Sequence, residues 1–159
     1  MISCSIPGRD NIEIRYLVCD VNGTLTRDGN LIPGVRESLA KLKEHVEIHL
    51  VSADTLGRLT EVETGLAGII TSTARLTPGS EAEQKLEYVQ KLGSSTTAAV
   101  GQGTNDRLML KGARLGICVL SSEGTATETL LNADIIVPDI LSAFDLFLKP
   151  DRLKATLRQ

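Results

Sequence analysis

Polar side chains that could do chemistry follow apolar runs at several points in this sequence. The first long apolar run begins at Tyr16 and ends in Asp20, and Asn22, Gly23 and Thr24 follow it. The later candidates are Ser52 after a second apolar run, Lys85 near a helix start, and residues 101–106, which include Gly101, Gly103, Asn105 and Asp106. In open α/β sheets, ligands bind just beyond the carboxyl ends of the strands. A carboxylate placed there, such as Asp20, could face a substrate from a rigid support.

Each of these residues also has a purely structural interpretation. An aspartate after a strand often forms a turn or caps a helix, and Ser52 could be an N-cap. Lys85 could be a solvated helix lysine, and the glycines at 101 and 103 could form a turn. The combination favours a site, because all four features would converge on one edge of a parallel sheet.

The elements that must position these residues alternate between strands and helices. Apolar alternation at 2–6 and 12–16, around a turn at 7–11, predicts an N-terminal β-hairpin. The Asp28-Gly29 pair predicts a small hairpin flap after the first long strand. Further strands are expected at 46–51, 68–73, 96–100, 115–120 and 135–137, and helices at 35–44, 60–66, 80–92, 107–113, 123–131 and 140–148. A last basic turn is expected at 150–158.

This order of elements predicts βαβ units and a mainly parallel sheet. We therefore expect an α/β protein with three layers, in which helices sandwich the central sheet and a β-hairpin precedes it. The chain has 159 residues, which is enough for a sizeable core. No internal repeat or linker divides it, so we expect one domain over residues 1–159.

The composition argues against several functional classes. The net charge is −3 and aromatic residues make up 3% of the chain, so neither a basic surface nor stacking platforms for nucleic acid are expected. The cysteines at 4, 19 and 118 have no CxxC spacing and suggest reduced core residues. No apolar segment has the length of a signal peptide or of a membrane span. We expect a cytoplasmic protein with no nucleic-acid or membrane partner.

The candidate residues resemble the four motifs of the haloacid dehalogenase superfamily of hydrolases. The matching segments, in order, are residues 20–24, Ser52, Lys85 and residues 101–106. The Asn105-Asp106 pair and the Met109-Leu110 that follows are most similar to the phosphorylation domain of P-type ATPases. More narrowly, they resemble small soluble P-type ATPase-like phosphatases. The resemblance extends from about residue 17 to 158 and implies the Rossmann-like fold of that superfamily.

The resemblance implies a role for each matching residue. Asp20 would attack phosphorus and become an aspartyl-phosphate. Asp20, the backbone carbonyl of Asn22 and Asp106 would bind Mg²⁺. The groups that hold the phosphoryl oxygens would be the amides of Gly23 and Thr24, the hydroxyl of Ser52 and the ammonium of Lys85, with Asn105 orienting phosphate or Lys85.

Electrostatics agrees with a requirement for a cation. A phosphate dianion that approaches Asp20 and Asp106 is repelled by about 4 kcal/mol per pair of unit charges, for a separation of ~4 Å and an effective dielectric constant of ~20. Carboxylate, carbonyl and water oxygens are the ligands that Mg²⁺ prefers. Lys85 would then balance charge on the transferring group.

Two positions depart from the pattern of the superfamily. Its phosphatases carry an acid–base aspartate where this chain has Asn22, which cannot exchange a proton. Losing a placed general acid–base costs about 10²- to 10⁴-fold in rate. Gln102 stands where a metal-binding aspartate is usual, so Mg²⁺ should bind less tightly. We expect slow phosphatase activity that is highest on activated leaving groups such as aryl phosphates.

The spacing of the motifs leaves no room for a cap domain. One βα unit fills each interval between motifs, so the site should be open. It could take a phosphorylated small molecule or a phosphoprotein, or a neighbouring subunit of a homo-oligomer could cover it.

Three other functions are compatible with parts of the pattern. Asn22 and Gln102 could mark a silenced protein that binds phosphate or a partner on the same scaffold. A response-regulator receiver would carry its phosphorylated Asp after the third strand, where this chain has none. A dinucleotide site would need a third glycine after Gly103, and Asp106 would repel the pyrophosphate.

Overall fold

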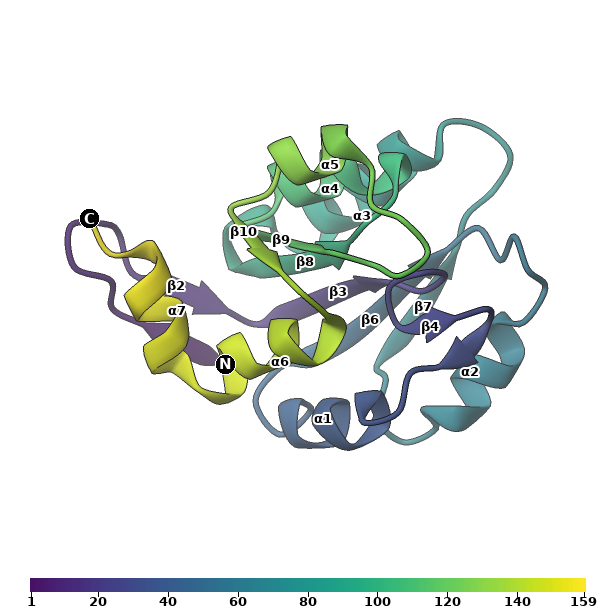
Figure 1. Cartoon of the computed structure of the whole chain (residues 1–159), viewed down its shortest axis with the longest axis horizontal. Coiled ribbons are helices and arrows are strands. Elements are labelled where there is room, and N and C mark those ends of the chain that lie inside the picture. Colours follow the sequence, from purple (N-terminus) through teal and green to yellow (C-terminus); the bar gives the residue numbers. More distant parts are fainter.

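The computed structural model describes residues 1–159 and contains a six-stranded sheet between two layers of helices (Figure 1). All strand pairs in this sheet are parallel, and the order is β10-β9-β8-β3-β6-β7. The strands are β3 (Tyr16–Asp20), β6 (Glu47–Ser52), β7 (Ser72–Arg75), β8 (Thr97–Gly101), β9 (Leu115–Val119) and β10 (Ile135–Val137). The three-layer α/β/α fold expected from the sequence is confirmed.

Helices cover both faces of the sheet, as Figure 1 shows. One face carries α3 (Glu81–Leu92), α4 (Arg107–Gly112) and α5 (Thr127–Leu131), and the other carries α1 (Val35–Leu42), α2 (Leu59–Gly65) and α6 (Ile140–Leu148). Successive residues of β3 point to opposite faces, so Val18 packs in the core under α3 and α4 while Leu17 and Cys19 pack in the larger core under α1 and α6. These two cores hold β3 rigid from both sides.

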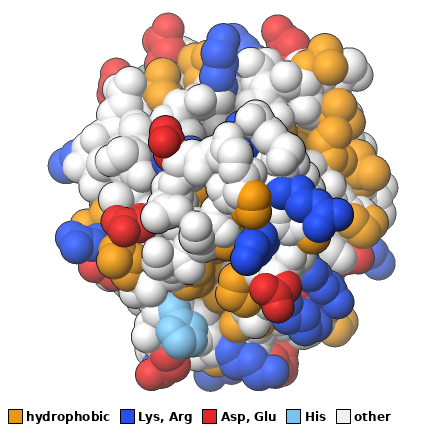
Figure 2. Space-filling view, turned by 90° about the vertical axis from the view of Figure 1, so that its left-hand side faces the viewer, with side chains coloured by type: hydrophobic (Ala, Val, Ile, Leu, Met, Phe, Trp, Pro, Cys, Tyr) orange, Lys and Arg blue, Asp and Glu red, His pale blue; other side chains and the backbone are white.

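The N-terminal hairpin lies at one end of the sheet, where both chain termini are found (Figure 1). It consists of β1 (Ile2–Cys4) and β2 (Ile12–Ile14), which pair antiparallel and pack beside α7 (Pro150–Leu157). Acidic, basic and apolar side chains are interspersed over this end of the molecule (Figure 2). No helix combines the length and the apolar character that crossing a membrane requires.

The expected hairpin flap is also present, as β4 (Thr26–Arg27) and β5 (Asn30–Leu31) around a turn at Asp28 and Gly29. It directly follows the turn after Asp20. Only this flap and α1 lie between β3 and β6, and only α2 and β7 lie between β6 and α3. Neither interval contains a cap domain.

Three elements differ from the expected ones. The segment at 150–158, expected as a basic turn, contains the helix α7. The third strand was expected at 68–73, but β7 is Ser72–Arg75, because Ile69 packs into the large core from a turn after α2. The helix expected at 123–131 begins only at Thr127. Gly124 has a φ of +102°, and the Thr125 hydroxyl accepts a hydrogen bond from Ser121 N, so residues 121–126 form a loop.

Candidate active site

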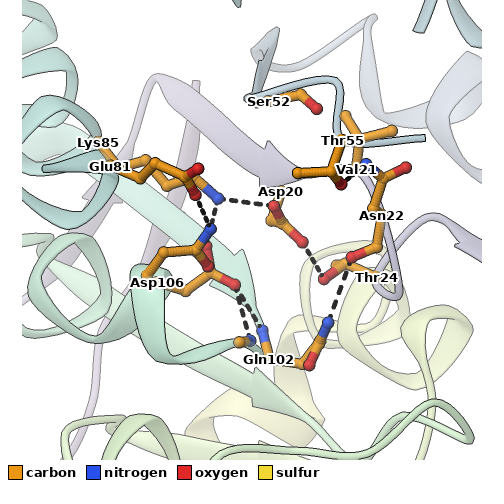
Figure 3. Close-up of polar contacts among 12 residues, drawn as sticks. Asp20, Val21, Asn22, Thr24, Ser52, Thr55, Glu81, Lys85, Gln102 and Asp106 are labelled. Atoms are coloured by element: carbon orange, nitrogen blue, oxygen red, sulfur yellow. Dashed lines mark hydrogen bonds and ion pairs between the residues drawn. The ribbon is translucent and has the colours of Figure 1, made fainter. Parts of the chain in front are cut away.

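Asp20 lies at the carboxyl end of the central strand β3, as expected. Both of its carboxylate oxygens have a partner: Lys85 Nζ donates to Oδ1 at 2.7 Å and Thr24 Oγ1 donates to Oδ2 at 2.8 Å (Figure 3). The Asp20 side chain is 8% exposed, whereas Lys85 and Asp106 are fully enclosed. Asp20 is therefore the member of this cluster that a substrate can reach.

Lys85 is held between two carboxylates. Its helix, α3, begins after Ser80, whose hydroxyl accepts a hydrogen bond from Glu83 N and caps the helix. Nζ lies 2.7 Å from Oδ1 of Asp20 and 2.7 Å from Oδ1 of Asp106. Burial alone would lower the pKa of Lys85, but the two carboxylates outweigh it and hold that pKa above its ordinary value. The ammonium group therefore stays charged.

Asp106 anchors the other side of Lys85. It ends a single 3₁₀ turn (Thr104–Asp106), and its Oδ2 accepts hydrogen bonds from the backbone amides of Gln102 and Gly103, both at 2.9 Å. Burial and the charge of Asp20 raise the pKa of Asp106 to about 6, against the opposing effect of Lys85 and the amide of Gln102. A Cβ on Gly101 would lie 2.5 Å from Cγ of Asp106, so this close approach requires a glycine.

Two of the expected residues also have partners within the protein. Asp106 was expected to bind metal, which stays a prediction; its oxygens accept hydrogen bonds from Lys85 and from backbone amides. The amide of Thr24 was expected to hold a phosphoryl oxygen, which also stays a prediction; it donates to the carbonyl of Val21 and closes the turn. Asp106 thus positions Lys85, and Thr24 positions Asp20 through its hydroxyl.

The backbone carbonyl of Asn22 faces the site from the turn after β3. It accepts a hydrogen bond from Gln102 Nε2 at 3.2 Å, and the Asn22 side chain donates to Thr55 Oγ1 at 3.1 Å (Figure 3). The other end of the Gln102 amide is an oxygen, which a rotation of that group would bring to the same place. With Asp20, the site thus offers one carboxylate and two neutral oxygens, a donor set that fits Mg²⁺.

The remaining expected residues have different surroundings. Ser52 ends β6 beside Asp20, is buried, and accepts a hydrogen bond from Asp54 N, which leaves its hydroxyl proton to donate. The Gly23 amide has no backbone acceptor and could bind an anion. Asn105 makes no hydrogen bond to Lys85; its Nδ2 donates to Glu81 Oε2, one helical turn before Lys85, at 2.6 Å.

Two hydrogen bonds at the site were not predicted from the sequence: Asn105 donates to Glu81, and Gln102 donates to the Asn22 carbonyl. The spacing of Glu81 and Lys85, four residues apart on one helix face, was the available signal for the contact of Glu81.

Cys19, adjacent to Asp20, is fully buried on the opposite face of β3, and burial raises the pKa of its thiol far above its usual range. Its expected place in the core is confirmed.

A pocket of about 320 Å³ adjoins the site from the side of the flap. It lies between the flap and the loops that follow β9 and β10, and its lining includes Gly23, Thr24, Arg27, Leu120 and Ile140. Neither Asp20 nor Lys85 lines it. The pocket thus shares the turn after β3 with the candidate site without containing the carboxylate of Asp20.

Comparison with known proteins gives one family relationship. No protein-family model matches the chain. The uncharacterized protein MJ0073 of Methanocaldococcus jannaschii is 46% identical over 84 residues, which are 50% of this chain and 90% of that protein. The copper-transporting ATPase HMA5 of Oryza sativa subsp. japonica is 31% identical over 135 residues, which are 80% of this chain but only 13% of the ATPase.

Solved structures resemble the fold over nearly its whole length. The 3-deoxy-D-manno-octulosonate 8-phosphate phosphatase from Moraxella catarrhalis, in complex with magnesium, phosphate and KDO, has a TM-score of 0.67 at 20% identity and covers 91% of this chain and 94% of its own. The cobalt-bound deoxy-D-mannose-octulosonate 8-phosphate phosphatase from Haemophilus influenzae has a TM-score of 0.67 at 14% identity, with 92% and 94% covered. The fold is therefore that of the haloacid dehalogenase type.

Proposed function

We propose that this chain is a Mg²⁺-dependent phosphohydrolase that works through an aspartyl-phosphate on Asp20. The chain belongs to the same family as MJ0073 and has the capless fold of the haloacid dehalogenase superfamily. The observation that carries the proposal is the buried cluster in which Lys85 Nζ lies 2.7 Å from both Asp20 and Asp106. Three separate elements bring these charges together, and only Asp20 opens to the surface. An ion pair with a purely structural role would need neither a second carboxylate nor the exposure of Asp20 to the surface.

Asp20 would act as the nucleophile. One of its carboxylate oxygens would form a bond to phosphorus while the bond from phosphorus to the leaving-group oxygen breaks. Lys85 would neutralise charge on the phosphoryl oxygens, and the Ser52 hydroxyl and the Gly23 amide would donate hydrogen bonds to them. Mg²⁺, held by Asp20, the Asn22 carbonyl and the Gln102 amide oxygen, would supply the positive charge that the dianionic substrate requires.

Asn22 explains why turnover would be slow. The leaving oxygen would take its proton from water, because the Asn22 amide cannot protonate it. In the second step, water would attack phosphorus, release inorganic phosphate and regenerate Asp20 without a placed base. Aryl phosphates, whose leaving groups need little protonation, would be the best substrates. The named substrate of the Moraxella catarrhalis phosphatase supports a phosphorylated small molecule here too, and a phosphoprotein is the second substrate class that the open site could take.

The test is hydrolysis of an aryl phosphate by the wild type and by Asp20→Asn, with Mg²⁺ and with a chelator. We expect slow release of the aryl alcohol that needs both Mg²⁺ and Asp20. Hydrolysis by Asp20→Asn at the wild-type rate would overturn the proposal.

A second candidate function is a silenced protein that binds a phosphorylated ligand. The Gln102 amide favours it, because its Nε2 covers the Asn22 carbonyl at 3.2 Å. Such a protein would bind inorganic phosphate in calorimetry, and neither hydrolysis nor transfer of a phosphoryl group to Asp20 would be seen.

A further inference from the structure

The proposed cation site draws one carboxylate, that of Asp20, from the three groups that would hold the cation. The Asp106 carboxylate is used by Lys85 and two amides, and Gln102 and the Asn22 carbonyl are neutral. Only Asp20 is anionic there, and Lys85 already pairs with it at 2.7 Å. Lys85 offsets one of the two carboxylate charges of Asp20 and Asp106, so a divalent cation would meet a single net negative charge among these groups.

Glu123 brings another carboxylate to this place. A Cβ built on Gly23 would lie 2.3 Å from Gln102 Nε2 and 3.6 Å from Glu123 Oε2, so both side chains converge over the turn after β3. Gln102 Nε2 is also the atom that contacts the Asn22 carbonyl. The Glu123 carboxylate is exposed and makes no ion pair and no hydrogen bond within the protein.

The loop that carries Glu123 is fixed on both sides of the site. Ala126 N donates to the Gln102 carbonyl at 2.9 Å, which ties the loop to the segment that follows β8. Arg27 Nε on the flap donates to Ser122 Oγ at 2.9 Å. Because residues on either side of Glu123 are anchored, its position over Gly23 does not depend on a freely moving chain.

We propose that Glu123 supplies the second carboxylate of the divalent-cation site, in place of the aspartate that Gln102 replaces. The proposal rests on the proposed function, since it concerns the same cation. Glu123 would bind the cation directly or accept hydrogen bonds from its bound water, as Mg²⁺ retains several waters in protein sites. Either contact adds one negative charge next to two neutral oxygens.

The test measures binding of Mn²⁺ to the protein without substrate, by the electron paramagnetic resonance signal of free Mn²⁺. We expect Glu123→Gln to weaken binding by about 10- to 100-fold, as the loss of outer partners of a metal site does. Glu128→Gln is the matched control, because Glu128 is an exposed carboxylate on the adjacent helix α5, and it should bind like the wild type. Thermal unfolding of each variant verifies the fold.

A second variant tests whether the charge matters at this place. Gln102→Asp should tighten Mn²⁺ binding, and the further loss caused by Glu123→Gln should be smaller in that background. Any of three results would overturn the role of Glu123. Glu123→Gln could bind Mn²⁺ as tightly as the wild type, Glu123→Gln and Glu128→Gln could weaken binding equally, or the wild type could bind no Mn²⁺. Asp20-dependent hydrolysis, measured separately, would still support the proposed function in those cases, whereas its absence would remove that function independently.

Discussion

Lys85 supplies the positive charge that pairs with both buried carboxylates of the site, Asp20 and Asp106. Removing the charge of Lys85 would leave Asp20 and Asp106 buried and facing each other. Deleting one partner of a buried ion pair costs about 3–5 kcal/mol, because the other charge is left uncompensated. The raised pKa of Asp106, about 6, indicates that this carboxylate would respond first, by taking up a proton.

We therefore predict that Lys85→Met loses about 3–5 kcal/mol of unfolding free energy at neutral pH and loses phosphoryl transfer. Urea denaturation and aryl phosphate hydrolysis measure the two effects. Lys91→Met, at an exposed position of the same helix, is the control and should change neither. A Lys85→Met protein with wild-type stability would show that the cluster is not energetically coupled.

The second prediction at this scale concerns Asn22, which we hold responsible for slow turnover. Asn22→Asp keeps the shape of the side chain, and Thr55 Oγ1 can donate to the new carboxylate at the same distance. An acid–base group placed there should raise turnover by about 10²- to 10⁴-fold, with alkyl phosphates gaining more than aryl phosphates. Steady-state kinetics on both substrates checks this, with Asn11→Asp, on the exposed N-terminal turn, as a control for charge. Unchanged rates on both would mean that proton transfer does not limit the reaction.

The sequence predicted which residues meet, and it was less informative about how they meet. Asp20, Lys85 and Asp106 come together at one edge of a parallel sheet, where β3 ends, α3 begins and the 3₁₀ turn after β8 lies. Their hydrogen bonds depend on local backbone geometry that no motif spells out. The 3₁₀ turn at 104–106 directs Asp106 toward amides and Lys85, and the turn after β3 uses the Thr24 amide.

At the scale of elements, the strands and the helices as far as α6 were predicted, and their errors lie at the ends. The segment predicted as a basic turn at 150–158 forms the helix α7. β7 begins four residues later than expected, because the apolar Ile69 belongs to a turn that fills the core. α5 starts four residues late, because Gly124 and the Thr125 hydroxyl stabilise a loop. That second difference matters for function, since it places Glu123 in a loop over the site.

A histidine couples β6 to α3 and makes stability depend on pH. His49 on β6 is buried, its Nδ1 lies 2.9 Å from Tyr88 Oη on α3, and its Nε2 has no hydrogen-bond partner. Burial lowers the pKa of His49, and the nearby Glu47 carboxylate opposes this only in part. The unfolded chain therefore takes up this proton first as the pH falls, and the stability that neutral His49 contributes is lost below about pH 6.5.

We predict that His49→Gln flattens the fall of unfolding free energy between neutral pH and the acid side of pH 6.5, relative to the wild type. The raised pKa of Asp106 acts in the opposite direction, since the folded chain takes up that proton first as the pH falls through about 6. The comparison of the two proteins isolates His49, and the exposed His45→Gln is its control. Identical pH profiles for wild type and His49→Gln would contradict the assignment.

At the scale of the whole molecule, the carboxylate of Asp20 lies at one edge of the sheet, and the flap follows the turn after it. The intervals between motifs contain the flap, α1, α2 and β7, so under the proposed function we expect substrate specificity to come from the flap and the loops after β8, β9 and β10. The pocket of about 320 Å³ beside the flap is lined in part by Gly23 and Thr24 of the turn after Asp20. This arrangement supports an accessible nucleophile that small phosphoryl donors can reach.

The most direct test of the central claim is the mass of the intact protein after incubation with acetyl phosphate and Mg²⁺. We predict a mass increase of one phosphoryl group, located on Asp20 by peptide mapping, removed by hydroxylamine and absent from Asp20→Asn. Phosphorylation at another residue, or no mass increase in wild-type protein that still binds divalent cations, would contradict it.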